Sequence, residues 1–303
     1  MRGSRGTPFF VRRILDFHEE AMNQDPFDAH SQSPITPVKL GLDDQFQFAC
    51  HSQIACFNKC CQSIDIQLTP YDILRLKTRL QISAREFLFR HTVPFEMDGH
   101  GVPGLKLRTA DESTRCQFLT EQGCGVYEDR PTACRYYALG LMSMRKKDSP
   151  TDEDAYFIVK EEHCLGHHEP QTQTVRAYRE SQGVDVYDDM NREWRQVVLK
   201  KRSCGPTIGK PSDRSLQLFF LASYDLDGFR DFISTPSFDE VYVVSPQERE
   251  QLMQDDVALM RFAFRFLKQS LFGETTIPER PEAMEKRLAR RKERSAATSG
   301  EAG

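Results

Sequence analysis

Apolar residues recur every three or four positions in several segments of the chain, and this spacing predicts amphipathic helices. Residues 9–21 carry one such stripe, which we interpret as part of an arm that packs on the body of the protein. Residues 184–200 carry a second stripe, which includes the single tryptophan, Trp194. A third stripe runs from Gln247 to Phe272 and predicts one long helix with a buried face.

Local signals mark where other helices begin and end. Thr69 and Asp72 are separated by a proline and a tyrosine, which is the pattern of an N-cap, a proline in the first turn and an acidic residue at the third position. Ser83 and Glu86 have the spacing of a capping box. Thr174 to Gly183 predicts a short helix that a glycine ends.

Alternating or short continuous apolar runs predict strands. Residues 105–108 alternate leucine with lysine or arginine, and residues 155–160 form an apolar run that predicts a buried or edge strand. Residues 241–244 predict a further strand. The fold expected from these elements is α+β, mostly helical with small strands, and it has a helical C-terminal subdomain.

Composition divides the chain into four expected parts. An N-terminal arm covers 1–45, a cysteine-rich domain covers 46–205, a packed C-terminal subdomain covers 206–275, and a polar, basic tail covers 276–303. The boundaries follow proline-rich connectors and the change to a charged composition near the end.

The overall composition is that of a globular protein with room for a sizeable core. The 303 residues are 39% apolar and 28% charged, with a net charge of -4. This charge gives no general attraction for nucleic acid or an anionic membrane, so neither partner is expected. The sequence has no secretory leader and no apolar stretch of membrane-spanning length. We therefore expect a cytoplasmic protein, and the sequence does not identify its redox or protein partner.

Eight of the nine cysteines fall into two dense groups, and the ninth, Cys204, lies apart and is interpreted as structural. In reducing cytosol, clustered cysteines bind metal or act in catalysis more often than they form disulfides. Buried structural thiols are the alternative, but the segments around the two groups are rich in glycine and polar residues rather than apolar ones. The predicted metal or cofactor ligands are Cys50, Cys56, Cys60, Cys61, Cys116, Cys124, Cys134 and Cys164.

The number and spacing of these thiols leave the metal open. Eight thiolates can make two sites of four, and a four-cysteine site suits zinc, [2Fe-2S] or [4Fe-4S]. Side chains of adjacent residues such as Cys60 and Cys61 point in different directions, so they reach two sites, or one cluster of several irons, more easily than one ion. The chain also lacks the C-x2-C pairs that structural zinc sites favour. We therefore favour an iron-sulfur cluster, [4Fe-4S] first, and keep zinc as the alternative.

Glycines and a short helical turn are expected to shape the second group. Gly123 and Gly125 flank Cys124 and suit a tight turn around a ligand. Asp129 to Pro131 can begin a helical turn whose free N–H groups ease the thiolate charge of Cys134.

Histidines and arginines near the cysteines have candidate roles of their own. Imidazole can replace a thiolate as a ligand, although solvated surface histidines are common in a polar run of this kind. Arg130 and Arg135 would offset the charge of an anionic cluster and raise its reduction potential, with an ordinary ion pair to Glu128 or Asp129 as the alternative. The candidate histidines are His163, His167 and His168.

The order of the motifs also resembles a known family. After Cys50 to Cys61 come Cys-x-Phe-Leu at Cys116, Gly-Cys-x-Val-Tyr-Glu-x-Arg-Pro-x-x-Cys-Arg from Gly123 to Arg135, and then Cys164. Over about residues 46–170 the chain resembles the YkgJ-type cysteine-cluster proteins, which are described as zinc- or iron-chelating and often labelled iron-sulfur oxidoreductases. The chain has C-x5-C-x3-C-C where the short form of the family motif is C-x2-C-x2-C-C.

Three functions remain open at this point. The first is a metal-binding protein with one or two iron-sulfur clusters and an electron-transfer or oxidoreductase role, as the resemblance implies. The second is a zinc-stabilised structural or adaptor protein. The third is an enzyme that modifies protein lysines, because a related cysteine domain occurs in flagellin lysine methylases, although no methyl-donor pocket is recognisable in the sequence.

Overall fold

A computed structural model describes residues 35–97, 101–110, 112–145, 152–203, 212–283 and 285. The predicted helix over 9–21, Cys204 and most of the polar tail lie outside these residues. Contacts between residues divide the chain into two compact units. The first holds most of the chain up to Arg192, and the second holds Glu193 onward together with residues 83–85 and 97–103.

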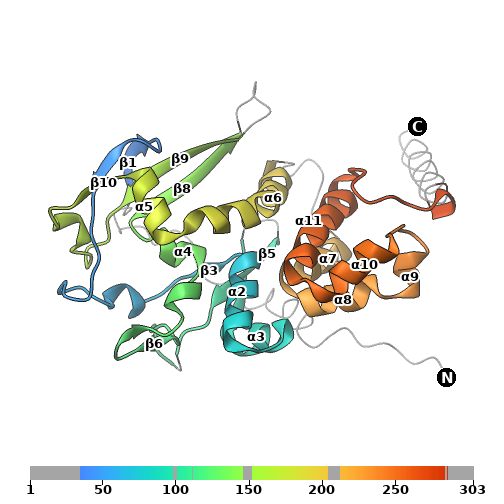
Figure 1. Cartoon of the computed structure of the whole chain (residues 1–303), viewed down its shortest axis with the longest axis horizontal. Coiled ribbons are helices and arrows are strands. Elements are labelled where there is room, and N and C mark those ends of the chain that lie inside the picture. Colours follow the sequence, from blue (N-terminus) through green and yellow to red (C-terminus); the bar gives the residue numbers. More distant parts are fainter. Residues whose placement is uncertain are drawn as a thin grey trace, which may run out of the picture. The chain divides into compact units, whose positions relative to one another are not determined.

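The first unit is built on a three-stranded antiparallel sheet with the order β1-β9-β8 (Figure 1). The predicted strand at 155–160 is confirmed as part of β9. A second, two-stranded pairing joins β10 to β2, with Gln173 opposite Phe46. The strands are β1 (Ile35–Leu40), β2 (Gln45–Gln47), β8 (Leu139–Arg145), β9 (Asp152–Val159) and β10 (Thr172–Thr174).

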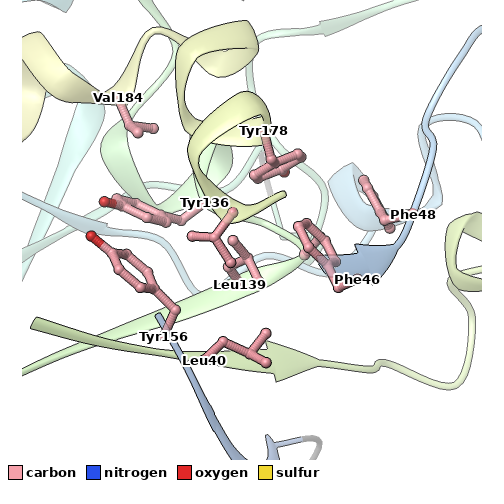
Figure 2. Close-up of a cluster of buried hydrophobic side chains, with 10 residues drawn as sticks. Leu40, Phe46, Phe48, Tyr136, Leu139, Tyr156, Tyr178 and Val184 are labelled. Carbon is pink, nitrogen blue, oxygen red and sulfur yellow. The ribbon is translucent and has the colours of Figure 1, made fainter. Parts of the chain in front are cut away.

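Aromatic rings fill the core between this sheet and helix α5 (Val175–Gln182), as Figure 2 shows. The ring of Tyr178 stands edge-on to Phe46 at 5.4 Å and to Phe48 at 5.8 Å, a geometry that aromatic pairs favour. Phe46 and Phe48 immediately precede the first cysteine group. Their burial therefore fixes where that group leaves the core.

The helices of the first unit begin where the sequence predicts. Thr69 and Asp72 form a complete capping box at the start of α2 (Pro70–Leu80). Thr174 caps α5, and Gly183 ends it with a positive φ of 62°. Helices α3 (Ala84–His91) and α6 (Val184–Ser203) are also confirmed.

A second small sheet has the order β3-β5-β4. Its strands are β3 (Gln67–Leu68), β4 (Thr92–Glu96) and β5 (Pro103–Leu107). In the sequence, β3 comes just before α2, and the other two strands follow α3. Leu105 and Leu107 are buried while Lys106 between them is partly exposed, so the predicted alternation is confirmed.

The second unit is a group of helices (Figure 1). Its core is rich in aromatic side chains. The ring of Phe232 lies 5.5 Å from Phe238 and 5.4 Å from Phe266, and Phe229 lies 5.5 Å from Phe266. The α+β class, mostly helical with small strands, is confirmed. The helices are α7 (Asp213–Tyr224), α8 (Leu226–Ile233), α9 (Pro236–Asp239), α10 (Pro246–Gln254) and α11 (Asp256–Phe272).

Two predictions for the second unit are wrong. The long helix predicted over 247–272 is two helices, because the Asp255 carboxylate accepts hydrogen bonds from the backbone N–H groups of Val257 and Ala258 and so begins α11. The strand predicted at 241–244 is a loop, in which Tyr242 makes an isolated β-bridge with Glu279. The ring of Tyr242 packs at a tilt against Phe238, with 4.7 Å between the ring centroids.

No helix in the described ranges has both the length and the apolar character required to traverse a lipid bilayer.

The helix break at Asp255 gives a stability prediction. Asp255→Ala removes the acceptor for two backbone N–H groups and should lower the free energy of unfolding by about 1 kcal/mol. Urea unfolding followed by circular dichroism measures this change. Asp255→Asn keeps a capping oxygen and should cost only a few tenths of that amount. Equal losses in the two variants would contradict the capping role.

Candidate metal centre

The first cysteine group lies in a loop that joins β2 to β3. The 3-10 turn η2 (Lys59–Cys61) interrupts this loop, and the chain enters it through Asn58 with a positive φ of 66°. Asparagine tolerates this left-handed conformation better than most residues. Cys56 precedes this turn, and the adjacent pair Cys60 and Cys61 lies within it.

The start of this loop is held against the segment that contains Cys164. The N–H of Ala49 donates to the carbonyl of Gly166 at 3.0 Å, and the N–H of Leu165 donates to the Cys56 sulfur at 3.3 Å. A Cβ on Gly166 would lie 2.5 Å from the Phe48 ring, so only glycine permits this approach. Cysteines more than a hundred residues apart in the chain are thereby neighbours.

The end of the loop is held against the second cysteine group. The N–H of Cys116 donates to the carbonyl of Cys61 at 2.8 Å. Beyond it, strand β6 (Leu119–Thr120) pairs with β7 (Gly123–Cys124), which places Cys124 opposite Leu119. The φ of Gly123 is 119°, which agrees with the predicted tight turn.

Cys134 lies on the one-turn helix α4 (Thr132–Arg135), which a buried carboxylate anchors. Asp72 accepts hydrogen bonds from Thr132 N at 2.8 Å and from Thr132 Oγ1 at 2.7 Å, while its other oxygen accepts from Thr69 N at 2.8 Å. The Asp72 side chain thus joins the start of α2 to the start of α4 across sixty residues of sequence.

The predicted relief of the Cys134 charge by this turn is wrong. The N–H of Thr132 donates to Asp72 rather than to the sulfur. Burial raises the pKa of the Cys134 thiol, and the thiolates of Cys116 and Cys124 together with the Asp72 carboxylate raise it further.

Cys60 and Cys61 share a proton across 3.9 Å between their sulfurs. The hydrogen bond from Cys61 lowers the pKa of Cys60 to about 7. The same hydrogen bond, followed by burial, raises the pKa of Cys61. The pair therefore loses one of its two protons near neutral pH, and the resulting charge lies on Cys60.

These contacts bring all eight clustered cysteines into the first unit, within one stretch of the chain. Residues 49–165 match the CxxCxxCC family. The family model is described as "Putative zinc- or iron-chelating domain", and the matched residues include all eight cysteines. The match confirms the predicted resemblance and supports zinc or iron binding as the chemistry of this domain. Neither a curated protein nor a solved structure matches the chain.

Most thiols of the CxxCxxCC domain hold their protons tightly. Burial, followed by the thiolates of Cys60, Cys56 and Cys164, raises the pKa of Cys50 to about 11. Burial is also the main reason for the raised pKa values of Cys116, Cys124 and Cys164. A bound cation would remove this penalty, because metal ligation requires the deprotonated thiolate.

The two arginines of the CxxCxxCC domain take different positions. Arg130 lies 3.9 Å above the ring of Tyr127, and its positive charge acts to lower the pKa values of Cys50 and Cys124. Arg135 instead lies 4.1 Å from the ring of Tyr187 and donates to backbone carbonyls. Asp129, the alternative ion-pair partner, binds Arg75 at 2.5 Å.

The three candidate histidines are engaged or exposed. His167 has one ring nitrogen 2.8 Å from the Val159 carbonyl and the other 3.2 Å from the Gln47 carbonyl. His163 Nε2 lies 2.8 Å from the hydroxyl of Tyr137. His168 is exposed in the 3-10 turn η4 (Gly166–His168).

The donor set fits a soft metal in kind, but the sulfurs are not yet gathered around a common point. Within the part of the chain that the structure describes, no three histidine, cysteine, aspartate or glutamate side chains are grouped closely enough to hold an ion. Thiolates suit zinc and iron-sulfur clusters, and the raised pKa values mark crowded thiols.

Two residues that support the site are not evident from the sequence. The sequence marks Asp72 only as part of a helix cap, and its hydrogen bonds to Thr132 have no local signal. Tyr137 acts on Cys164 and lowers the pKa of that thiol, against the larger effect of burial. Its position three residues after Cys134 is the only clue in the sequence.

The low pKa of Cys60 predicts its reactivity in the reduced, metal-free chain. At pH 7 Cys60 should react with iodoacetamide roughly fivefold faster than a thiol of ordinary pKa, because a larger thiolate fraction outweighs a lower nucleophilicity. Peptide mapping by mass spectrometry identifies the site. Cys61→Ala removes the hydrogen-bond donor and should abolish the fast phase. A fast phase that maps to another cysteine would contradict this assignment.

The buried Asp72 carboxylate predicts a large loss of stability on its removal. Asp72→Ala leaves the Thr132 N–H and hydroxyl without their acceptor and should cost about 3 kcal/mol in urea unfolding. Thr132→Val removes only the hydroxyl bond and should cost about 1 kcal/mol. Similar losses in both variants would show that the Asp72 bridge contributes no more than a single hydrogen bond.

Proposed function

We propose that the CxxCxxCC domain holds one or two iron-sulfur clusters through its eight clustered cysteines and serves in electron transfer or as an oxidoreductase. The observation that carries this proposal is the pair of contacts that bring Cys56 next to the segment of Cys164 and Cys61 next to Cys116, within residues 49–165. The charges of neighbouring thiolates raise the pKa values of Cys50 and Cys134, and a multi-iron cluster would spread such charge.

Two features favour iron-sulfur over zinc. The adjacent Cys60 and Cys61 lie on a tight turn and suit several metal atoms better than one tetrahedral ion. The positive charge of Arg130 acts on Cys50 and Cys124, which belong to different halves of the site. An anionic cluster surrounded by thiolates gains from such a fixed charge, which also raises its reduction potential.

The protein's own residues would tune such a centre. A bound iron-sulfur cluster supplies one-electron transfer. The eight cysteines would hold it. Hydrogen bonds to ligand sulfur raise the reduction potential, and Tyr137 would act in this sense on Cys164, whose pKa it lowers. The N–H of Leu165 acts in the same sense on Cys56. Burial of Cys56 limits the access of water to this sulfur.

A zinc-stabilised structural or adaptor protein is the second candidate. The loop from residue 48 to residue 66 has little regular secondary structure apart from the turn η2. Structural zinc can stabilise such a segment, because the energy of metal binding becomes folding energy. Chelation would then destabilise the fold without any redox signal.

Anaerobic purification of the full chain distinguishes these candidates. We expect a brown protein with iron and acid-labile sulfide in similar amounts and a visible absorption band that dithionite bleaches. A double substitution of the adjacent pair, Cys60→Ser with Cys61→Ser, should lower the iron and sulfide content at least twofold. Cys204→Ser is the matched control and should change neither. A colourless protein that contains zinc alone would contradict the iron-sulfur proposal and support the structural one.

A further inference from the structure

Backbone hydrogen bonds sort seven of the eight cysteines into two groups. The first group lies where the loop that begins near Ala49 meets the segment around Gly166, and we call this place the first crossing. There Ala49 donates to the carbonyl of Gly166 at 3.0 Å and Leu165 donates to the sulfur of Cys56 at 3.3 Å. Phe48 donates to the Gln171 carbonyl at 3.0 Å and extends the same crossing. The cysteines at this crossing, which we name the first thiol group, are Cys50, Cys56 and Cys164.

The second crossing lies where the end of the turn η2 meets the segment around Cys116. Cys116 donates to the Cys61 carbonyl at 2.8 Å, and Leu119 donates to the Cys116 carbonyl at 3.1 Å while it pairs with Cys124. Helix α4, which carries Cys134, packs against β3, the strand that follows this crossing. The cysteines here, which we name the second thiol group, are Cys61, Cys116, Cys124 and Cys134.

The count of ligands then decides where Cys60 belongs. The second thiol group already has four members, which is the number that zinc and the common iron-sulfur clusters take. The first thiol group has three. Cys60 is adjacent to Cys61, and side chains of consecutive residues point in different directions, so Cys60 can turn toward the first group while Cys61 serves the second.

We infer that the domain holds two separate four-cysteine sites, with Cys60 completing the first thiol group and Cys61 belonging to the second; this inference rests on the proposed function. The adjacent pair is then the boundary between two metal centres. Because consecutive Cα atoms lie about 3.8 Å apart, the two centres would be near neighbours. A single metal site shared by all eight thiols is the arrangement that this inference excludes.

Cobalt titration of the reduced full chain under argon tests this division, because Co²⁺ bound by four thiolates has intense charge-transfer and d-d absorption whatever the natural metal is. The wild-type chain should bind two equivalents with this spectrum. Cys164→Ser and Cys134→Ser should each bind one. Cys164→Ser combined with Cys134→Ser should bind none, and Cys204→Ser should still bind two.

Double substitutions place the adjacent pair. Cys60→Ser combined with Cys164→Ser should retain one equivalent, because both losses fall in the same site. Cys60→Ser combined with Cys134→Ser should retain none. Circular dichroism checks that each variant is folded, and Cys124→Ser replaces Cys134→Ser if the latter unfolds. The reverse pattern, or full loss in any single folded variant, would overturn the division.

The wild-type result separates this inference from the proposed function. One equivalent of four-thiolate cobalt in the wild-type chain would overturn the two-site division and leave a metal-binding function intact. No cobalt binding by the wild-type chain would overturn both. Two equivalents together with the expected pattern of losses would support both, and iron and sulfide analysis then identifies the natural group.

Discussion

Mutual repulsion among the thiolates of eight clustered cysteines constrains the whole CxxCxxCC domain. Thiolates placed close together cannot all be charged unless a cation lies among them, and burial makes each charge more costly still. Without metal, raised pKa values favour the protonated form of six of these thiols, whereas a hydrogen bond from Cys61 lowers the pKa of Cys60. The same crowding that disfavours thiolates in the metal-free chain is what makes the segment suited to a soft metal.

The surrounding fold supplies rigidity that the cysteine loops lack. Phe46 and Phe48 hold the start of the first loop in the aromatic core, and Gly166 lets the segment after Cys164 approach it closely. On the other side, Asp72 fixes the turn that carries Cys134. The loops that carry the cysteines are therefore held at their ends by the surrounding fold.

The parts of the structure that the sequence predicts are those with local causes. The start of α2 follows from Thr69 and Asp72, which lie within one turn of each other. The break at Asp255 was missed because the apolar stripe continues across it, so the capping signal was hidden within a longer pattern. The second function of Asp72 depends on Thr132, sixty residues away, and no local pattern reports it.

The candidate site divides in the same way between local and distant causes. Cysteine density and motif order predict the metal-binding segment and its family. Spacing alone does not reveal that Cys164 lies beside Cys56, because that contact depends on the packing of Phe48 against Gly166. The expected effect of the helical turn on Cys134 failed for a similar reason, since a distant carboxylate takes the N–H group first.

Tyr137 has a consequence for communication between the site and solvent. Its hydroxyl has one proton and three acceptors nearby, namely the Cys164 sulfur, the His163 ring and the Glu161 carboxylate. Only one of them can receive that proton at a time. In the proposed iron-sulfur protein, a change of charge at the Cys164 sulfur would therefore redirect the hydroxyl and reach the exposed imidazole of His163.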